Sequence, residues 1–297
     1  TGVQTCALPI LLKMKEVPVV DIKITDLKKL YQKGYNMLEE LRHEADAPVV
    51  KAKIFNKEAI TIYGSSAAKV FYDPRNFKRK GAMPKLVLKT LFGQGGVQTL
   101  DGAAHHHRKN IFMDLMTPER MEDYLRILDK NLTQALEAQH GQFELFDLSK
   151  MVFFTSICEW AGINLSAISK DEVEKLAEYQ ISMISGTFTS PIDHIKGVEN
   201  RKKSEKWAQG LIEEARQNPV AGKENVALYA FANATDLDGQ LLPLEVAAVE
   251  LLNIIRPTVA LTVWAALMGH ALFSRPDLYQ QLKNDFSTLQ DPFIQEM

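Results

Sequence analysis

The sequence, 297 residues long, has few cysteines that could form disulfide bonds and no long apolar run that could span a membrane. Its two cysteines, Cys6 and Cys158, are too few for a disulfide framework, so we expect a reducing, cytoplasmic setting. No uninterrupted apolar run approaches the ~20 residues that a membrane span requires. The longest apolar stretch, 251–267, is interrupted by Arg256 and Pro257, and we therefore expect a buried helix and no membrane span.

An excess of charge of one sign is also missing. Lys and Arg number 35 against 37 for Asp and Glu, a formal net charge of −2, which argues against a nucleic-acid partner. Hydrophobic residues make up 46% and charged residues 24%, which is ordinary for a folded globular protein and excludes disorder as the main state. The length allows one large domain or two of ordinary size.

The two ends of the sequence look unlike natural ends. Residues 1–10 begin without Met and resemble the translation of a sequencing-library adapter, with neither the basic region nor the cleavage site of a signal peptide. We expect them to be a non-native segment, with a native tail as the alternative. Residues 293–297 stop inside a helical pattern without a stop signal, so we expect 11–297 to be part of a longer domain.

Apolar residues recur at helical spacing along most of the sequence, which predicts a mainly α-helical fold. The first such segment is 26–41, with Thr25 as its expected cap. Apolar residues on both sides of Asn56 predict a small β-hairpin within 49–62. We expect a loop at 93–96 and further helices at 65–73, 84–91, 102–116, 119–139, 148–162, 170–185, 199–217, 225–233, 243–273 and 277–286.

Three consecutive histidines at 105–107 invite a metal-site hypothesis. Consecutive residues of a helix point about 100° apart, so these three side chains do not converge on one ion. One helical turn after His105 stands Lys109, a cation, and the pair suits an anion better than a metal. The alternative is a solvated basic helix face.

The sharpest anomaly is Arg256-Pro257, in the middle of the most hydrophobic helical segment. Pro257 lacks the amide that would bond to the Asn253 carbonyl, so we expect a kink there. Arg256 stays protonated, and its burial costs several kcal/mol unless an anion meets it. Two interpretations stay open: a site for an anionic ligand, or an internal ion pair with Glu250 or a distant acid.

Taken together, several segments resemble the fatty-acid peroxygenases of the cytochrome P450 superfamily. The resemblance is carried by 66–73 (SAAKVFYD), 83–85 (MPK), 91–93 (LFG), 97–102 (VQTLDG), 105–109 (HHHRK), 115–118 (LMTP) and 253–257 (NIIRP). It covers essentially all of 11–297. It implies a mainly α cytochrome P450 fold, incomplete at its C-terminal end, in which 244–273 is the long central helix over a haem b cofactor.

The resemblance also implies an activity: hydroxylation of long-chain fatty acids at the α or β carbon with hydrogen peroxide, without a redox partner. In that family an Arg-Pro pair replaces the acid–alcohol pair of ordinary P450s. Arg256 and Pro257 are therefore the expected catalytic residues, with Arg256 holding the fatty-acid carboxylate, which itself acts as acid and base for the peroxide. Phe92 and Gln98 would line the substrate pocket, and Gln98 favours hydroxylation over decarboxylation.

By the same resemblance, His105, Lys109 and Arg79 would contact the haem propionates. The loop with the cysteine ligand of the haem iron would lie beyond Met297. Cys158 stands in an apolar helical segment typical of a packed core thiol. We therefore expect the parent protein to be a peroxygenase and this fragment to be inactive. The alternatives are a monooxygenase with a redox partner, a fatty-acid decarboxylase, and a non-enzymatic helical carrier of fatty acids.

Overall fold

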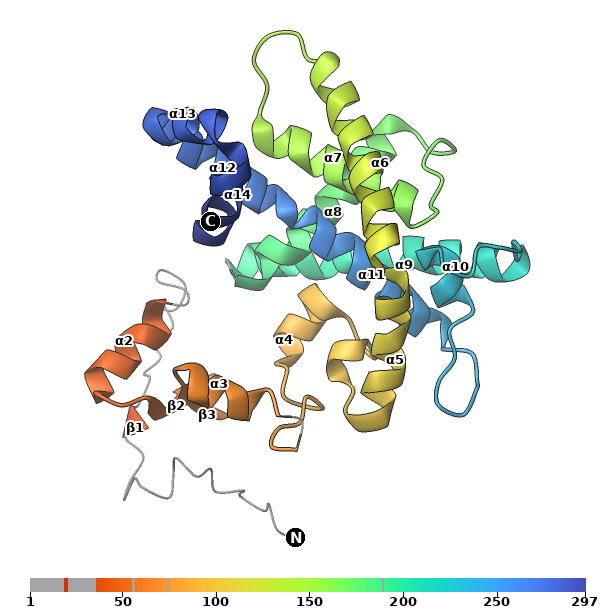
Figure 1. Ribbon diagram of the computed structural model, residues 1–297. Helices are drawn as coiled ribbons and strands as arrows, with labels where there is room; N and C mark the ends of the chain where they lie inside the picture. The colour runs from red at the N-terminus through yellow and green to blue at the C-terminus, as the bar shows by residue number, and fades with distance from the viewer. Residues whose placement is uncertain (1–18, 21–35, 55–56, 74, 189) are drawn as a thin grey trace. The chain divides into compact units, whose positions relative to one another are not determined.

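The computed structural model describes residues 19–20, 36–54, 57–73, 75–188 and 190–297 (Figure 1). The chain divides into two units, Thr1–Arg79 and Lys80–Met297. The expected non-native segment 1–10 and the first part of the expected helix at 26–41 lie outside the described residues.

The first unit carries the predicted hairpin. Strand β2, Val49–Ile54, pairs antiparallel with β3, Lys57–Ile62, and Val49 lies opposite Ile62. A third strand, β1 (Val19–Val20), pairs parallel with β2 and gives a sheet of order β1-β2-β3. Two residues are too few to leave an alternating pattern, so the sequence did not indicate β1.

Among the described residues of this unit, two helices accompany the sheet. Helix α3 spans Ser65–Phe71, within the predicted range. Helix α2 spans Asn36–Ala45, so the predicted end at Leu41 was wrong. Asp46, with a φ of 45°, ends the helix in the left-handed conformation, which glycine adopts more often than aspartate.

Helix dominates the second unit. Its elements are α4 (Lys85–Val87), η2 (Leu88–Phe92), η3 (Val97–Thr99), α5 (Gly102–Leu115), α6 (Pro118–Glu137), α7 (Leu145–Trp160), α8 (Lys170–Phe188), α9 (Pro191–Gln217), α10 (Ala227–Ala232), α11 (Leu244–Val259), α12 (Leu261–Ser274), α13 (Pro276–Asn284) and α14 (Phe286–Glu296). Except for η3 and α14, these occur where helices were predicted, and the loop at 93–96 is also present. The main differences are that α9 begins well before residue 199, and that a separate helix α14 follows α13.

Both differences arise from capping residues. The Ser190 hydroxyl accepts a hydrogen bond from the Asp193 amide, and Pro191 takes the first helical position of α9. At the start of α14, the Asp285 carboxylate accepts a hydrogen bond from the Thr288 amide at 3.3 Å. In both cases the helix begins after a polar capping residue, and the spacing of apolar residues does not indicate where that residue lies.

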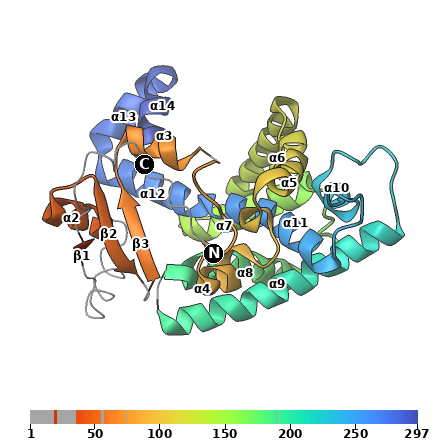
Figure 2. The same ribbon diagram turned by 90° about the horizontal axis from the view of Figure 1, so that it is seen from below.

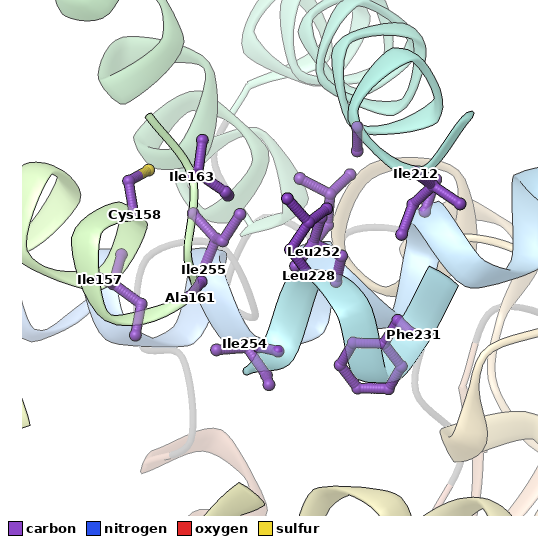
Figure 3. Packing of buried hydrophobic residues seen from close by; sticks show 14 of the residues in the cluster. Ile157, Cys158, Ala161, Ile163, Ile212, Leu228, Phe231, Leu252, Ile254 and Ile255 are labelled. Atoms are coloured by element: carbon purple, nitrogen blue, oxygen red, sulfur yellow. The ribbon is translucent and has the colours of Figure 1, made fainter. Parts of the chain in front are cut away.

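The hydrophobic core of the second unit joins α7, α9, α10 and α11 (Figure 3). Ile212, Phe231 and Ile255 are fully buried in it. Cys158 is part of the same cluster, and burial raises the pKa of its thiol. The prediction that Cys158 is a packed core thiol is therefore confirmed.

The long apolar helix expected at 243–273 is interrupted. It breaks at Ala260, between α11 and α12, a few residues after Pro257. The Ala260 amide still donates to the Arg256 carbonyl at 3.0 Å, whereas the Val263 amide donates to the Ala260 carbonyl at 3.1 Å in a tighter turn. Among the described residues, Leu244–Ser274 is the one stretch long and apolar enough to cross a membrane, and 67% of its most apolar window is buried inside the protein. That burial is typical of a core helix.

Helices α8 and α9 lie side by side and approach each other through two glycines (Figure 2). A Cβ at Gly186 would lie 2.5 Å from the Asp193 carbonyl oxygen. A Cβ at Gly197 would lie 2.9 Å from the Ser182 carbonyl oxygen. Both distances are shorter than van der Waals contact, so only glycine permits this spacing of the two backbones.

Candidate functional site

Arg256 lies in α11 and is only 5% exposed. Its Nη2 donates to Asn253 Oδ1 at 3.3 Å, and its Nη1 donates to the Leu91 carbonyl oxygen. Its Cζ lies 5.6 Å from the centre of the Phe92 ring. In the part of the chain that the structure describes, no carboxylate lies within ion-pair distance of Arg256. The guanidinium is thus a buried cation with neutral acceptors only.

A second guanidinium reaches the same carbonyl. Arg201, in α9, is 2% exposed, and its Nη1 donates to the Leu91 carbonyl oxygen at 2.7 Å. Its Nε donates to Glu205 Oε1 at 2.7 Å, while its Nη2 is buried without a hydrogen-bond partner. Two cations and one carboxylate therefore surround this carbonyl, which leaves an excess of positive charge.

Burial lowers the pKa of both arginines, and the charge of Arg201 adds to this effect at Arg256. Burial first, and then the charge of Arg201, lower the pKa of Arg256 to about 9. Burial lowers the pKa of Arg201 as well, against the opposing effect of Glu205. The protein interior therefore holds Arg256 in a cationic state that an incoming anion would stabilise.

The backbone around Leu91 explains why its carbonyl is available. Leu91 belongs to η2, a π-helical turn that ends at Gly93, whose amide donates to the Leu88 carbonyl at 2.8 Å. The last carbonyls of a helical turn have no following amide to accept from. Gly93 has a φ of +76°, and a Cβ there would lie 2.1 Å from Arg201 Nη2. Glycine is required at this position for both reasons.

Glu250 is engaged elsewhere. Its Oε1 accepts from Arg108 Nη1 at 2.7 Å, and its Oε2 accepts from Asn253 Nδ2 at 2.9 Å. Glu250 is fully buried; burial raises its pKa, against the opposing effects of Asn253 and then Arg108. The expected alternative of an Arg256–Glu250 pair was wrong, because Glu250 pairs with Arg108.

The predicted substrate-site residues are brought together around α11. Phe92 and Gln98 are both half-buried. Phe92 contacts the Arg256 guanidinium, and Gln98 Oε1 accepts from Asn253 Nδ2 at 3.3 Å. Pro257 follows Arg256 but is exposed. Phe92 and Gln98 thus form one cluster with Arg256, Phe92 by direct contact and Gln98 through Asn253.

The predicted haem contacts belong to both units of the chain. His105 is half-buried and Lys109 is exposed, one turn apart on α5. Arg79 is exposed and is the last residue of the first unit, whereas His105 and Lys109 belong to the second. His107 turns away to the Thr235 carbonyl oxygen, 3.0 Å from its Nε2. No group of His, Cys, Asp and Glu among the described residues could hold a metal ion.

No model of a known protein family matches the sequence, but solved structures do. Cytochrome P450EXα (CYP152N1), solved with myristic acid, is 35% identical over 91% of this chain, with a TM-score of 0.83. A single-site variant of cytochrome P450SPα (CYP152B1) is 30% identical and has a TM-score of 0.84; the match covers 93% of this chain and 67% of that one. Cytochrome P450 OleT, solved with arachidonic acid, is 23% identical with a TM-score of 0.83, which supports the fold alone.

The fold is therefore that of a cytochrome P450, a superfamily whose members bind haem. Within it, the chain belongs to the CYP152 fatty-acid peroxygenases, which confirms the resemblance noted in the sequence. The chain spans 64% of the length of P450EXα.

Sequence reasoning missed Arg201 and the Arg108–Glu250 pair. A signal for Arg201 was available. Along α9 the buried residues Gly197, Asn200, Ser204 and Ala208 recur at helical spacing around it. Small residues at that spacing indicate a face packed closely against another helix, and an arginine on such a face is buried with its charge.

Proposed function

We propose that the whole protein is a haem-dependent peroxygenase that hydroxylates long-chain fatty acids at the α or β carbon with hydrogen peroxide. The observation that carries this proposal is the buried Arg256 guanidinium, whose hydrogen-bond acceptors are a backbone carbonyl and a side-chain amide. A fatty-acid carboxylate supplies the negative charge that this site lacks. The myristic acid solved with P450EXα has that chemistry.

Arg256 would bind the carboxylate through its planar fork, which fixes the orientation as well as the position of the ligand. The ligand carboxylate, held in this way, would take a proton from hydrogen peroxide and return it to the departing oxygen. Phe92, stacked on the guanidinium, and Gln98, bonded to Asn253, would border the first carbons of the chain.

The overall reaction balances without further reactants. One C–H bond of the fatty acid becomes C–OH, and hydrogen peroxide is reduced to water. Since peroxide supplies both the oxygen atom and the oxidising equivalents, no redox partner is required. When bound, haem supplies the chemistry that activates the peroxide oxygen.

His105 and Lys109 would hold the haem propionates, with Arg79 as a further cation. The His105–Lys109 spacing on α5 fits an anionic group. Cys158 does not fit as a ligand of the haem iron, because its thiol is fully buried in the core and burial raises its pKa. A thiolate ligand of the haem iron in the whole protein would therefore come from another residue.

Binding of tetradecanoate and of neutral 1-tetradecanol, measured by calorimetry, tests the carboxylate site on this chain. Arg256→Ala should lower the preference for the acid by about 100-fold, because a charge-assisted, bidentate contact is lost. Affinity for the alcohol should stay unchanged. Arg126→Ala, at an exposed arginine paired with Asp123, is the matched control and should alter neither ligand. Preference for the acid that survives Arg256→Ala would refute the site.

Turnover by the haem-loaded whole protein separates the enzyme from a fatty-acid carrier. With a substrate that has no carboxylate, added acetate should stimulate peroxide-driven oxidation, since it replaces the missing acid–base group. Stimulation should vanish in Arg256→Ala. Binding of fatty acid without peroxide-dependent turnover would support the carrier, and equal stimulation in both proteins would place the carboxylate elsewhere.

A further inference from the structure

Arg201 is the largest fully buried side chain among the described residues, yet the proposed reaction assigns it no role. Burial of an arginine is unfavourable unless its charge and its donors are satisfied. Here Glu205 satisfies Nε, the Leu91 carbonyl satisfies Nη1, and Nη2 has no partner. Because such burial is unfavourable for stability, it suggests that Arg201 has a functional role in addition to packing.

The shared carbonyl connects Arg201 to the carboxylate site. A carbonyl oxygen has two lone pairs, and Leu91 uses its own to accept from Arg201 Nη1 and from Arg256 Nη1. Arg201 thus fixes the position of the Leu91 carbonyl oxygen, and this same oxygen orients the Arg256 guanidinium. Displacement of Arg201 would leave the Leu91 carbonyl oxygen with one donor only. The orientation of the Arg256 guanidinium would then be less well fixed.

Charge adds to this positional effect. Glu205, whose side chain is 27% exposed, lies on the Nε edge of Arg201 and compensates its charge only in part. The uncompensated part of the Arg201 charge acts on Arg256 in a buried region where solvent screens it poorly. For this reason Arg201 contributes to the lowered pKa of Arg256. A carboxylate that arrives at Arg256 would be attracted by both cations.

We propose that Arg201 is a positioning residue of the carboxylate site, which fixes Arg256 through the shared Leu91 carbonyl and strengthens attraction for an anionic headgroup. The inference rests on the proposed function of Arg256 as carboxylate anchor. It deepens that function: Arg201 increases the preference of the Arg256 site for ionised fatty acids over neutral chains of equal length, and Glu205 moderates this increase.

Three variants test the proposal with the tetradecanoate-to-tetradecanol preference as readout. Arg201→Met, of similar length but neutral, should lower the preference for the acid about tenfold and leave alcohol affinity unchanged. Arg201→Lys should recover part of the loss, because it restores charge without the fork. Glu205→Gln keeps a hydrogen-bond acceptor but removes a negative charge, so it should raise the preference about threefold.

The opposite signs expected for Arg201→Met and Glu205→Gln distinguish positioning from a merely structural role. Equal weakening of acid and alcohol in Arg201→Met, or an unchanged or lower preference in Glu205→Gln, would overturn the proposal. If Arg201→Met does not fold, the half-exposed Glu205→Gln decides alone. A preference lost in Arg256→Ala but unaffected by both other variants would refute only the role of Arg201. A preference retained in Arg256→Ala would refute the carboxylate site as well.

Discussion

Arg108 and Arg256 stand at the two ends of one buried hydrogen-bonded chain, and their surroundings differ in charge. Arg108 meets the Glu250 carboxylate at 2.7 Å. From Glu250 the chain continues through Asn253 to Arg256, which meets only neutral oxygen atoms. The comparison teaches that burial of an arginine does not by itself mark a binding site. What distinguishes Arg256 is the lack of a counter-charge among the described residues.

This difference determines what each arginine does for stability. Removing one member of a buried ion pair leaves the other charge unpaired in the interior, which is strongly unfavourable. Removing a cation that has no counter-charge relieves a penalty instead. The two arginines should therefore affect the free energy of unfolding with opposite signs, although both are buried to a similar degree.

The largest expected effect is that of Arg108→Met on stability. It should lower the free energy of unfolding by about 3–5 kcal/mol, because Glu250 loses its cation. Denaturant unfolding measures this change, and addition of Glu250→Gln should recover most of it. Arg256→Met should leave the stability equal or higher. Similar losses from Arg108→Met and Arg256→Met would invalidate the comparison between the two arginines.

Gly93→Ala should have an intermediate effect. Its Cβ would displace Arg201 Nη2, and the left-handed backbone adds strain, for a combined loss of about 1–3 kcal/mol in stability. Tetradecanoate preference should fall with it. Gly222→Ala is the matched control, since Gly222 has a φ of +77° but open space around its Cβ position. If both variants lose the same stability and neither loses preference for the acid, Arg201 does not depend on Gly93.

The smallest expected effect is on pH dependence. With a pKa near 9, unliganded Arg256 loses its proton as the pH rises through that value, so affinity for tetradecanoate should be constant between pH 6 and 8 and fall about tenfold from pH 8 to 10. Titration calorimetry in this range checks the decline, which tetradecanol binding should not show. Constant acid affinity up to pH 10 would mean that Arg256 keeps its proton.

The same lowered pKa has a consequence for folding with a definite sign. With a pKa near 9, Arg256 should release its proton at a lower pH in the folded state than in the unfolded state. Stability increases with pH wherever the unfolded state binds more protons, so this group's contribution should rise as the pH increases above 9.

Much of the fold was predictable because local periodicity determines it. The helices and the hairpin each have a repeating apolar pattern, and the buried cation was apparent from Arg256 alone. Its partners were not, since Leu91 is 165 residues away and contributes a backbone carbonyl, which any residue type offers. Glu250 was a misleading candidate. At six residues from Arg256, it lies on a different face of α11, and Asn253 bridges the two.

The break of the long helix at Ala260 was not predicted, for a related reason. Pro257 removes one amide from the hydrogen-bond ladder, but the next turn of α11 still closes through the Ala260 amide. Sequence indicates where a donor is missing; the packing of the following turn decides where the axis is interrupted.

The glycine contact between α8 and α9 has a consequence for the order of folding. These helices are neighbours in sequence, so their pairing needs only a short loop to close and we expect it to form early. That step places Arg201 while its surroundings are still hydrated. Arg256 joins it only when contacts spanning 110 and 165 residues close, at Leu91. The two like charges therefore meet late, when the rest of the core can already hold them together.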